Sequence, residues 1–218
     1  MNKLKVGVLA SGRGSNFQSI IDSIGSGYLN AEIVLLVTDN PNAFAIEKAK
    51  KNGIEHLVMR PKEYSSKDTY YEAIAQELNR RSAGLVVLAG FMRVVRKPLV
   101  DAFPNKIMNI HPALLPSFPG LHGQQQAHDY SVKISGCTVH FVDEGMDTGP
   151  IIIQAAVAVK DDDNAGSLSE RILKFEHKIY PEAIKLFSEG RIEVVGRKVR
   201  IKDSAVDERG LVNPPLAG

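Results

Sequence analysis

The sequence predicts an α/β fold built on a mostly parallel, twisted sheet, with mixed strands in its C-terminal part. Three observations predict it: apolar runs alternate with helical patterns in the first half, β-rich runs occupy the second half, and the composition is globular. The 218 residues are 44% hydrophobic and 24% charged, which is ordinary for a folded domain. A chain of this length can bury a large core as one domain or as two small ones.

The first half of the chain alternates strand-like and helix-like segments. Val6–Ala10 is a short apolar run and predicts a buried strand. The next segment carries apolar residues at helical spacing, namely Phe17, Ile20, Ile21 and Ile24. Further strands are predicted over Ile33–Val37, His56–Met59 and Leu85–Ala89, and further helices over Ala43–Asn52 and around Tyr71, Ile74 and Leu78. This alternation predicts right-handed crossovers and a Rossmann-like sheet with helices on both faces.

The second half begins with Ile107–Ile110, a predicted fifth strand. The segment 111–122, HPALLPSFPGLH, contains three prolines, which exclude a regular helix or an inner strand there. An irregular segment of this length inside a compact domain is more often functional than not. Two β-rich runs, Thr138–Val142 and Ile151–Val159, follow it and predict the mixed strands.

The C-terminal part reads as a helix, a hairpin and a tail. A capping-box pattern at Ser167–Glu170 predicts the start of the helix. One face of that helix would carry Leu168, Ile172, Phe175, Ile179 and Ala183. Ile192–Val195 and Val199–Ile201 flank Gly196 and predict a terminal hairpin, and the tail DERGLVNPPLAG is expected to be loose.

We therefore expect one domain over residues 1–190, followed by the hairpin and tail over residues 191–218. The domain would have a ligand-binding N-terminal half, at about 1–100, and a second half, at about 101–190.

Charge and cysteine content exclude several classes of protein. Lys and Arg number 27 against 25 Asp and Glu, a formal net charge of +2, which argues against nucleic-acid or membrane partners. Cys137 is the single cysteine, so an internal disulfide is excluded and a reducing, cytoplasmic location fits. No apolar run approaches the roughly 20 residues of a membrane helix. The six histidines show no HExxH spacing, and we predict no metal site.

A glycine-rich segment, Ser11–Asn16, separates the first predicted strand from the first helix. Glycines let the backbone approach a ligand closely, and a helix start offers free N–H groups to an anion. The segment predicts a phosphate-binding loop, against the alternative of a plain turn in which Ser15 is the helix N-cap. A dinucleotide site, with Asp39 as the ribose-binding acid, is the other alternative, but Phe17 occupies the third glycine position.

Two further segments follow predicted strands. Residues 89–95, AGFMRVV, lie where open α/β sheets bind ligands, although core packing with Arg93 reaching solvent is the alternative. Asn109 and His111 alternate onto one side of the fifth strand and supply an amide donor and an imidazole. Pro112 then ends the strand. An Asn and a His entering a proline-rich segment together favour a functional site over a structural histidine.

The loop 143–150, DEGMDTGP, places carboxylates between glycines. Its spacing does not match an EF-hand calcium loop. A solvated turn is the remaining alternative, which the presence of Asn109 and His111 disfavours. Cys137 lacks a nearby basic cluster and is predicted to be a small buried residue rather than a nucleophile.

Together these segments resemble the phosphoribosylglycinamide formyltransferases (glycinamide ribonucleotide transformylases) of the folate-dependent formyltransferase superfamily. The matching text is VLASGRGSNFQSII, VVLAGFMRVV, NIHPALLPSFPGLHG, TVHFVDEGMDTGPII and FEHKIYP, in order from Val6 to Pro181. NIHPALLP with a later D-x-G-P marks the superfamily, and GRGSN is the narrower marker. The resemblance implies a cytoplasmic enzyme of purine (IMP) biosynthesis, a monomer or homodimer. It would transfer a formyl group from the co-substrate 10-formyltetrahydrofolate to the amine of glycinamide ribonucleotide, without a metal.

The resemblance also implies roles for individual residues. Gly14, Ser15 and Asn16 would hold the substrate's phosphate, and Glu176 would lie near its glycinamide part. The folate would be contacted by Asn109 and by Lys67, where the family commonly has Arg, and its pterin pocket would be lined by Met92, Arg93, Val94 and Val95. Catalysis would rest on Asn109, His111 and Asp147. The half at about 1–100 would accordingly bind the phosphate, and the half at about 101–190 would be the folate-binding and catalytic half.

In this reading the substrate amine attacks the formyl carbon, and negative charge develops on the formyl oxygen. Asn109 and a protonated His111 would stabilise that oxygen, and Asp147 would favour the protonated imidazole. Three alternatives share parts of this pattern: a formyltetrahydrofolate hydrolase, a methionyl-tRNA formyltransferase and a nucleotide-binding regulatory module. The 37 residues after Pro181 are fewer than the tRNA enzyme's extra domain needs, and the chain starts directly with its first strand, unlike the hydrolase.

Overall fold

The computed structural model of the protein describes residues 2–204, 211 and 213. The chain divides into two compact units. Unit 1 comprises Met1–Asn109 and Phe141–Gly145, and unit 2 comprises Ile110–His140 and Met146–Gly218. The division into a domain over residues 1–190 and a tail over residues 191–218 stays a prediction.

The described part of unit 1 contains five parallel strands with the neighbour order β3-β2-β1-β4-β5. They are β1 (Leu4–Leu9), β2 (Ala31–Thr38), β3 (His56–Val58), β4 (Leu85–Leu88) and β5 (Ile107–His111). The apolar run of β4 is buried along its whole length, as expected of a parallel strand covered on both faces. These strands confirm the sequence prediction of a parallel sheet.

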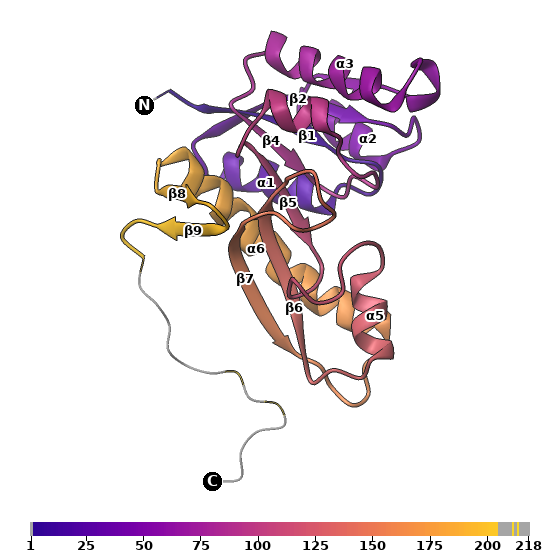
Figure 1. Cartoon of the computed structure of the whole chain (residues 1–218), viewed down its shortest axis with the longest axis vertical. Helices are drawn as coiled ribbons and strands as arrows, with labels where there is room; N and C mark the ends of the chain where they lie inside the picture. Colours follow the sequence, from indigo (N-terminus) through magenta and orange to yellow (C-terminus); the bar gives the residue numbers. More distant parts are fainter. Residues whose placement is uncertain (1, 205–210, 212, 214–218) are drawn as a thin grey trace. The chain divides into compact units, whose positions relative to one another are not determined.

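Helices flank the sheet of unit 1 on both faces. The helices are α1 (Ser15–Gly25), α2 (Phe44–Lys51), α3 (Lys67–Arg80) and α4 (Lys97–Ala102), with a 3-10 turn at Pro61–Glu63. Figure 1 shows α3 on one side of the strands and α1 on the other. The core between α3, α4 and the sheet includes Tyr70, Ile74 and Leu78, each at most 1% exposed.

Unit 2 contains the mixed strands. β6 (Ile134–Phe141) and β7 (Ile151–Ala158) pair antiparallel, and they extend the strand order to β3-β2-β1-β4-β5-β6-β7. The long helix α6 (Ala165–Ser188) packs against β7 and against α5 (Gly123–Asp129). The sheet as a whole is mostly parallel with antiparallel strands in its C-terminal part, which confirms the predicted fold class.

The predicted terminal hairpin is present as β8 (Ile192–Val195) and β9 (Lys198–Ile201), which pair antiparallel around Gly196. The prediction of a loose tail concerns residues that lie almost entirely outside the described ones. Of the described tail residues, Asn213 donates hydrogen bonds of 2.7 Å to the carbonyl oxygens of Lys133 and Val159.

The predicted capping box at Ser167–Glu170 is wrong by three residues. Asn164 is the N-cap, and its side chain accepts a 3.0 Å hydrogen bond from Ser167 N while Ser167 Oγ accepts one of 3.1 Å from Asn164 N. The capping box is therefore Asn-x-x-Ser, and Ser167 lies inside the first turn of α6. The short helices α4 and α5 were not predicted at all.

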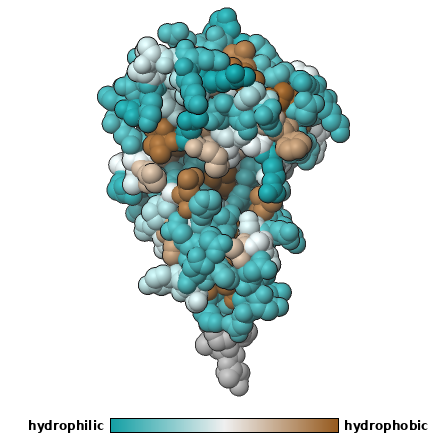
Figure 2. Space-filling model, turned by 90° about the vertical axis from the view of Figure 1, so that its right-hand side faces the viewer, coloured by the Kyte–Doolittle hydropathy of each residue, from teal (hydrophilic) through white to brown (hydrophobic). Residues whose placement is uncertain are grey.

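The surface carries scattered apolar side chains. Figure 2 shows a mostly hydrophilic face with small, separate apolar patches. Among the residues that the structure describes, no helix is both long and apolar enough to cross a membrane.

The start of α6 is fixed by Asp163, whose side chain is 3% exposed. Arg171 donates hydrogen bonds of 2.5 and 2.7 Å to its two carboxylate oxygens. Ser167 Oγ and Lys160 N donate further bonds, each of 2.8 Å. The Arg171 hydrogen bonds hold the pKa of Asp163 well below its usual value. A carboxylate whose pKa is lowered by folding stabilises the protein above its unfolded pKa of about 3.9, and this contribution is lost as the pH falls below that value.

We expect Asp163→Ala to lower the free energy of unfolding by about 2 kcal/mol at pH 7, because Arg171 and two other donors lose their acceptor. The difference from the unchanged protein should shrink as the pH falls below about 4. Urea denaturation at pH 7 and pH 3 measures both effects. Asp161→Ala is the matched control, since Asp161 is 91% exposed in its pair with Lys133 and its loss should leave the free energy of unfolding nearly unchanged. Equal stability of the two variants at pH 7 would contradict the role of Asp163.

Candidate active site

The loop after β1 enters α1 through Gly14, which has a left-handed backbone with φ of 64° and ψ of 41°. A Cβ atom added at Gly14 would lie 3.0 Å from Ala45 Cβ and 3.2 Å from Ala45 Cα. Gly14 is itself the N-cap residue, and no described side chain caps the helix. The alternative in which Ser15 is the N-cap is therefore wrong, because Ser15 is the first helical residue. A helix start whose backbone N–H groups have no side-chain cap is suited to an anion.

Ser11 ties this loop to the segment that follows β4. Its N–H donates a 3.0 Å hydrogen bond to the carbonyl of Gly90, and its Oγ accepts one of 2.9 Å from Met92 N. Asn40 Nδ2 donates to the carbonyl of Ser11 at 3.1 Å. The loops at the carboxyl ends of β1, β2 and β4 are thus bonded together, where open α/β sheets bind ligands.

The segment 92–95 is anchored by two polar contacts. Arg93 Nε lies 2.5 Å from Asp39 Oδ2, and the Asp39 side chain is 8% exposed. Tyr71 OH donates a 2.9 Å hydrogen bond to the carbonyl of Val94, and burial raises the pKa of Tyr71 to about 12. The Asp39 carboxylate is therefore paired with Arg93 and anchors the segment 92–95, instead of serving as the ribose-binding acid of the dinucleotide alternative. No sequence signal identified this pairing, because the two residues lie 54 positions apart.

The anchored segment exposes some of its apolar side chains and buries others. Met92 is 61% exposed and Val94 is 53% exposed, whereas Val95 is buried in the core of unit 1 at 5%. Val95 thus follows the core-packing alternative. Lys67 is exposed at the first position of α3, and no described contact joins it to residues 92–95.

In unit 2, His111 and Asp147 lie side by side. His111 is 3% exposed, and its Nδ1 is 3.4 Å from Asp147 Oδ2. Its Nε2 is 2.8 Å from the carbonyl oxygen of Phe118. Because a carbonyl oxygen can only accept a hydrogen bond, Nε2 carries a hydrogen and is the donor of this bond. The proline-rich segment therefore fixes the orientation of the imidazole.

Asp147 is held by its own loop and by Gly120. Its backbone is left-handed, with φ of 54°, which is uncommon for a residue other than glycine. Gly120 N donates a 2.8 Å hydrogen bond to Asp147 Oδ2. The other carboxylate oxygen, Oδ1, lies 3.7 Å from Nε2 of His140, which is 1% exposed. The carboxylate of Asp147 thus lies between two buried imidazoles.

His140 is the residue of this cluster that sequence reasoning missed. Strand alternation along β6 places it on the same side as Thr138, whose hydroxyl donates a 2.8 Å hydrogen bond to the carbonyl of Ala113 in the proline-rich segment. The alternation of β6 was the available sequence signal for His140. It indicates a place in this cluster only once β6 is known to lie beside the proline-rich segment.

Asn109 and Glu176 occupy separate elements. Asn109 is half-buried on β5, opposite Leu88 of β4, and lies two residues before His111 on the same side of the strand. Glu176 is buried at 6% exposure on α6. Burial, with the charge of Glu176, raises the pKa of the Cys137 thiol to about 12. Cys137 is free and buried, as predicted.

The described contacts join two sets of the residues predicted to form the site, and they do not include Asn109, Lys67 or Glu176. In unit 1 the loop that holds Gly14, Ser15 and Asn16 is bonded through Ser11 to the segment 92–95. In unit 2 His111 meets Asp147. Among the described residues, no group of three or more His, Cys, Asp or Glu is placed to hold a metal ion.

Comparisons with known proteins give a consistent result. A family model described as formyl transferase matches residues 4–184. The chain is 44% identical over 181 residues to phosphoribosylglycinamide formyltransferase of Bacillus subtilis (strain 168), with 83% of this chain and 93% of that protein covered. It is 43% identical over 188 residues to the trifunctional purine biosynthetic protein adenosine-3 of Drosophila melanogaster, covering 85% of this chain but only 14% of that protein's length.

A solved structure, glycinamide ribonucleotide transformylase 1 from Symbiobacterium toebii, matches with a TM-score of 0.91 and 48% sequence identity. The match covers 93% of this chain and 95% of that chain.

The tight packing of Gly14 against Ala45 leads to a stability prediction. Gly14→Ala should lower the free energy of unfolding by about 1–3 kcal/mol, because the left-handed backbone and the contact with Ala45 both oppose a side chain. Gly12→Ala is the matched control, since an added Cβ there meets nothing within 4 Å. Thermal and urea unfolding of both variants test this. A Gly14→Ala protein as stable as Gly12→Ala would contradict the conformational requirement.

Proposed function

The chain belongs to the formyl transferase family, and from this premise we propose that it transfers a formyl group from 10-formyltetrahydrofolate to the amine of glycinamide ribonucleotide. Such a reaction is a step of purine biosynthesis. The observation that carries the proposal is the buried pair of His111 and Asp147, fixed by Phe118 and Gly120. We expect the enzyme to act in the cytoplasm on small molecules, as a monomer or homodimer, without a nucleic-acid or membrane partner.

The ribonucleotide phosphate is assigned to the start of α1. Gly14, Ser15 and Asn16 form that start, where the left-handed Gly14 brings the backbone round and no described side chain caps the helix. Backbone N–H groups and the helix dipole favour a dianionic guest there. Glu176, which carries a carboxylate on α6, is assigned to the substrate's glycinamide part.

The folate is assigned to the segment after β4. Met92 and Val94 expose apolar side chains for a flat ring, while Arg93 is held by Asp39 and Val94 by Tyr71. Val95 is buried in the core of unit 1 and holds the end of the segment there. Lys67 and Asn109 complete the assigned folate contacts.

The chemistry needs donors for a developing oxyanion and a route for one proton. When the amine attacks the formyl carbon, negative charge grows on the formyl oxygen, and the side-chain amide of Asn109 is a hydrogen-bond donor of the kind that stabilises it. His111 is the second assigned donor, and its Nε2 must exchange the hydrogen bond to the Phe118 carbonyl for one to the formyl oxygen. Asp147 Oδ2, which lies 3.4 Å from His111 Nδ1, orients the imidazole. General acid–base catalysis by a positioned side chain typically contributes roughly 100- to 10,000-fold in rate.

Substitutions at the three assigned catalytic residues test the proposal. Asn109→Ala and His111→Ala should each lower kcat by about 100-fold or more, because each removes one oxyanion donor. Asp147→Asn should lower kcat by a similar factor while keeping the Gly120 hydrogen bond. The assay follows formyl transfer from 10-formyltetrahydrofolate to glycinamide ribonucleotide, and circular dichroism checks folding.

His128→Ala is the matched control, since His128 is a half-buried histidine of the same unit whose described ion pair is with its neighbour Asp129. Near-normal kcat in His111→Ala would refute the assignment. Formate release without the ribonucleotide amine, at a rate equal to transfer, would favour the hydrolase alternative instead.

The anchoring of Arg93 gives a separate test of the folate assignment. Asp39→Asn removes the charge that holds Arg93 and should raise KM for 10-formyltetrahydrofolate about 3- to 10-fold, with kcat changed by less than about twofold, because only binding is affected. Asp68→Asn, which breaks the exposed pair with Arg96, is the matched control and should leave KM unchanged. An unchanged KM in Asp39→Asn would contradict the assignment of this segment.

A further inference from the structure

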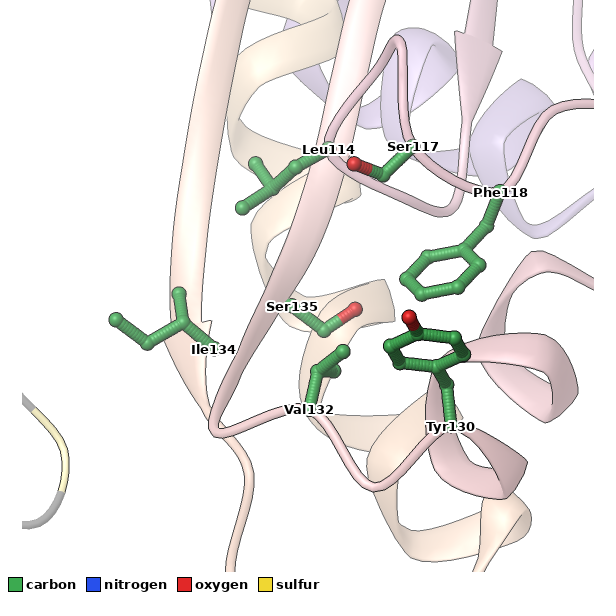
Figure 3. Close-up of a pocket in the computed structure, with 7 residues that line it drawn as sticks. All are labelled: Leu114, Ser117, Phe118, Tyr130, Val132, Ile134 and Ser135. Atoms are coloured by element: carbon green, nitrogen blue, oxygen red, sulfur yellow. The ribbon is translucent and has the colours of Figure 1, made fainter.

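A cavity of about 400 Å³ opens in unit 2, next to the proline-rich segment. Leu114, Ser117 and Phe118 of that segment form one part of its wall, and Tyr130 and Val132, at and after the end of α5, form another. Ser135 of β6 also lines it (Figure 3). A volume of this size lies in the usual range for sites that bind small organic molecules.

Ser135 is a buried polar residue in the wall of this cavity. The residue is 2% exposed, and its Oγ has no hydrogen-bond partner among the described residues. Figure 3 shows the hydroxyl directed toward the rings of Phe118 and Tyr130, that is, into the cavity. Buried hydroxyl groups are nearly always hydrogen-bonded in folded proteins. A ligand in this cavity would supply the missing partner.

The rest of the wall defines the chemistry of the ligand. The rings of Phe118 and Tyr130 lie edge to face, with centroids 5.9 Å apart and planes at 61°. Leu114 and Val132 add aliphatic surface, and no charged side chain is among the described lining residues. A flat apolar body fits such a wall through aromatic packing, and the uncharged lining favours a neutral molecule.

We propose that this cavity is a second ligand site, which takes a neutral planar aromatic molecule with one hydrogen-bonding group that pairs with Ser135 Oγ. The site is built wholly within unit 2, and none of its lining residues is assigned to formyl transfer. It is nevertheless next to His111, because Phe118 lines the cavity while its carbonyl accepts the 2.8 Å hydrogen bond from His111 Nε2. A bound molecule therefore contacts the residue that orients His111.

The test uses 2-naphthol as the probe and naphthalene, which lacks the hydroxyl, as its matched counterpart. Titration of the full chain, followed by protein NMR, should give saturable shifts at Phe118, Tyr130 and Ser135 and at the His111 ring. Ser135→Ala should weaken 2-naphthol binding about fivefold, which corresponds to about 1 kcal/mol for one hydrogen bond. The same substitution should leave naphthalene binding unchanged.

A second variant keeps the test independent of any effect on folding. Ser117 is exposed at the edge of the cavity, so Ser117→Phe should fill the cavity and abolish 2-naphthol binding. Ser26→Ala, at an exposed serine of unit 1, is the matched control and should bind as the unchanged protein does. Three results would each overturn the proposal: no saturable shift, shifts that leave out Phe118, Tyr130 and Ser135, or an affinity for 2-naphthol that neither Ser135→Ala nor Ser117→Phe alters. Formyl-transfer activity plays no part in these readouts.

Discussion

The hydrogen bond from Gly120 N to Asp147 Oδ2, 2.8 Å long, is the constraint on which the arrangement in unit 2 depends. Gly120 lies near the end of the proline-rich segment and Asp147 lies in the DEGMDTGP loop, so this bond joins two irregular loops that have no ladder of their own. His111 Nδ1 faces the same oxygen at 3.4 Å. Because Asp147 has a left-handed backbone, which costs free energy for a non-glycine residue, its position needs the support that the Gly120 N–H provides.

In unit 1, hydrogen bonds between loops likewise fix the loops at the carboxyl ends of the parallel strands. Ser11 donates through its backbone to Gly90 and accepts through its hydroxyl from Met92. Strands that run in parallel bring their loops to a common edge, but only such hydrogen bonds give the loops a fixed conformation. The Arg93–Asp39 pair then fixes the outer part of the segment. Rigid strands set the positions, and loop hydrogen bonds set the orientations.

Much of the fold was predictable because it follows from local periodicity. The apolar runs of β1, β2 and β4 and the helical spacing around Ile74 are properties of short segments. The start of α6 was not predictable in this way, because only Ser167-x-x-Glu170 matches the usual Ser/Thr-x-x-Glu/Gln pattern of a capping box. The observed box begins at Asn164 and uses the hydroxyl of Ser167 in place of a Glu or Gln side chain. Next to it, Asp163 is bonded to Arg171 of the same helix. The helix α5, with seven residues and no side-chain cap at His122, gave no periodic signal at all.

The site was predictable for a different reason, and only in part. Asn109, His111 and Asp147 stood out because their chemistry is unusual next to glycine and proline, and the structure places His111 beside Asp147. His140 and Asp39 did not stand out, since each gains its meaning from a partner that is distant along the chain or from the register of a strand. Asp147 and His111 are, moreover, held by Gly120 N and by the Phe118 carbonyl, which are backbone groups that nearly every residue type carries. Sequence reasoning reads side chains, so it finds the groups suited to chemistry before it finds the groups that hold them in place.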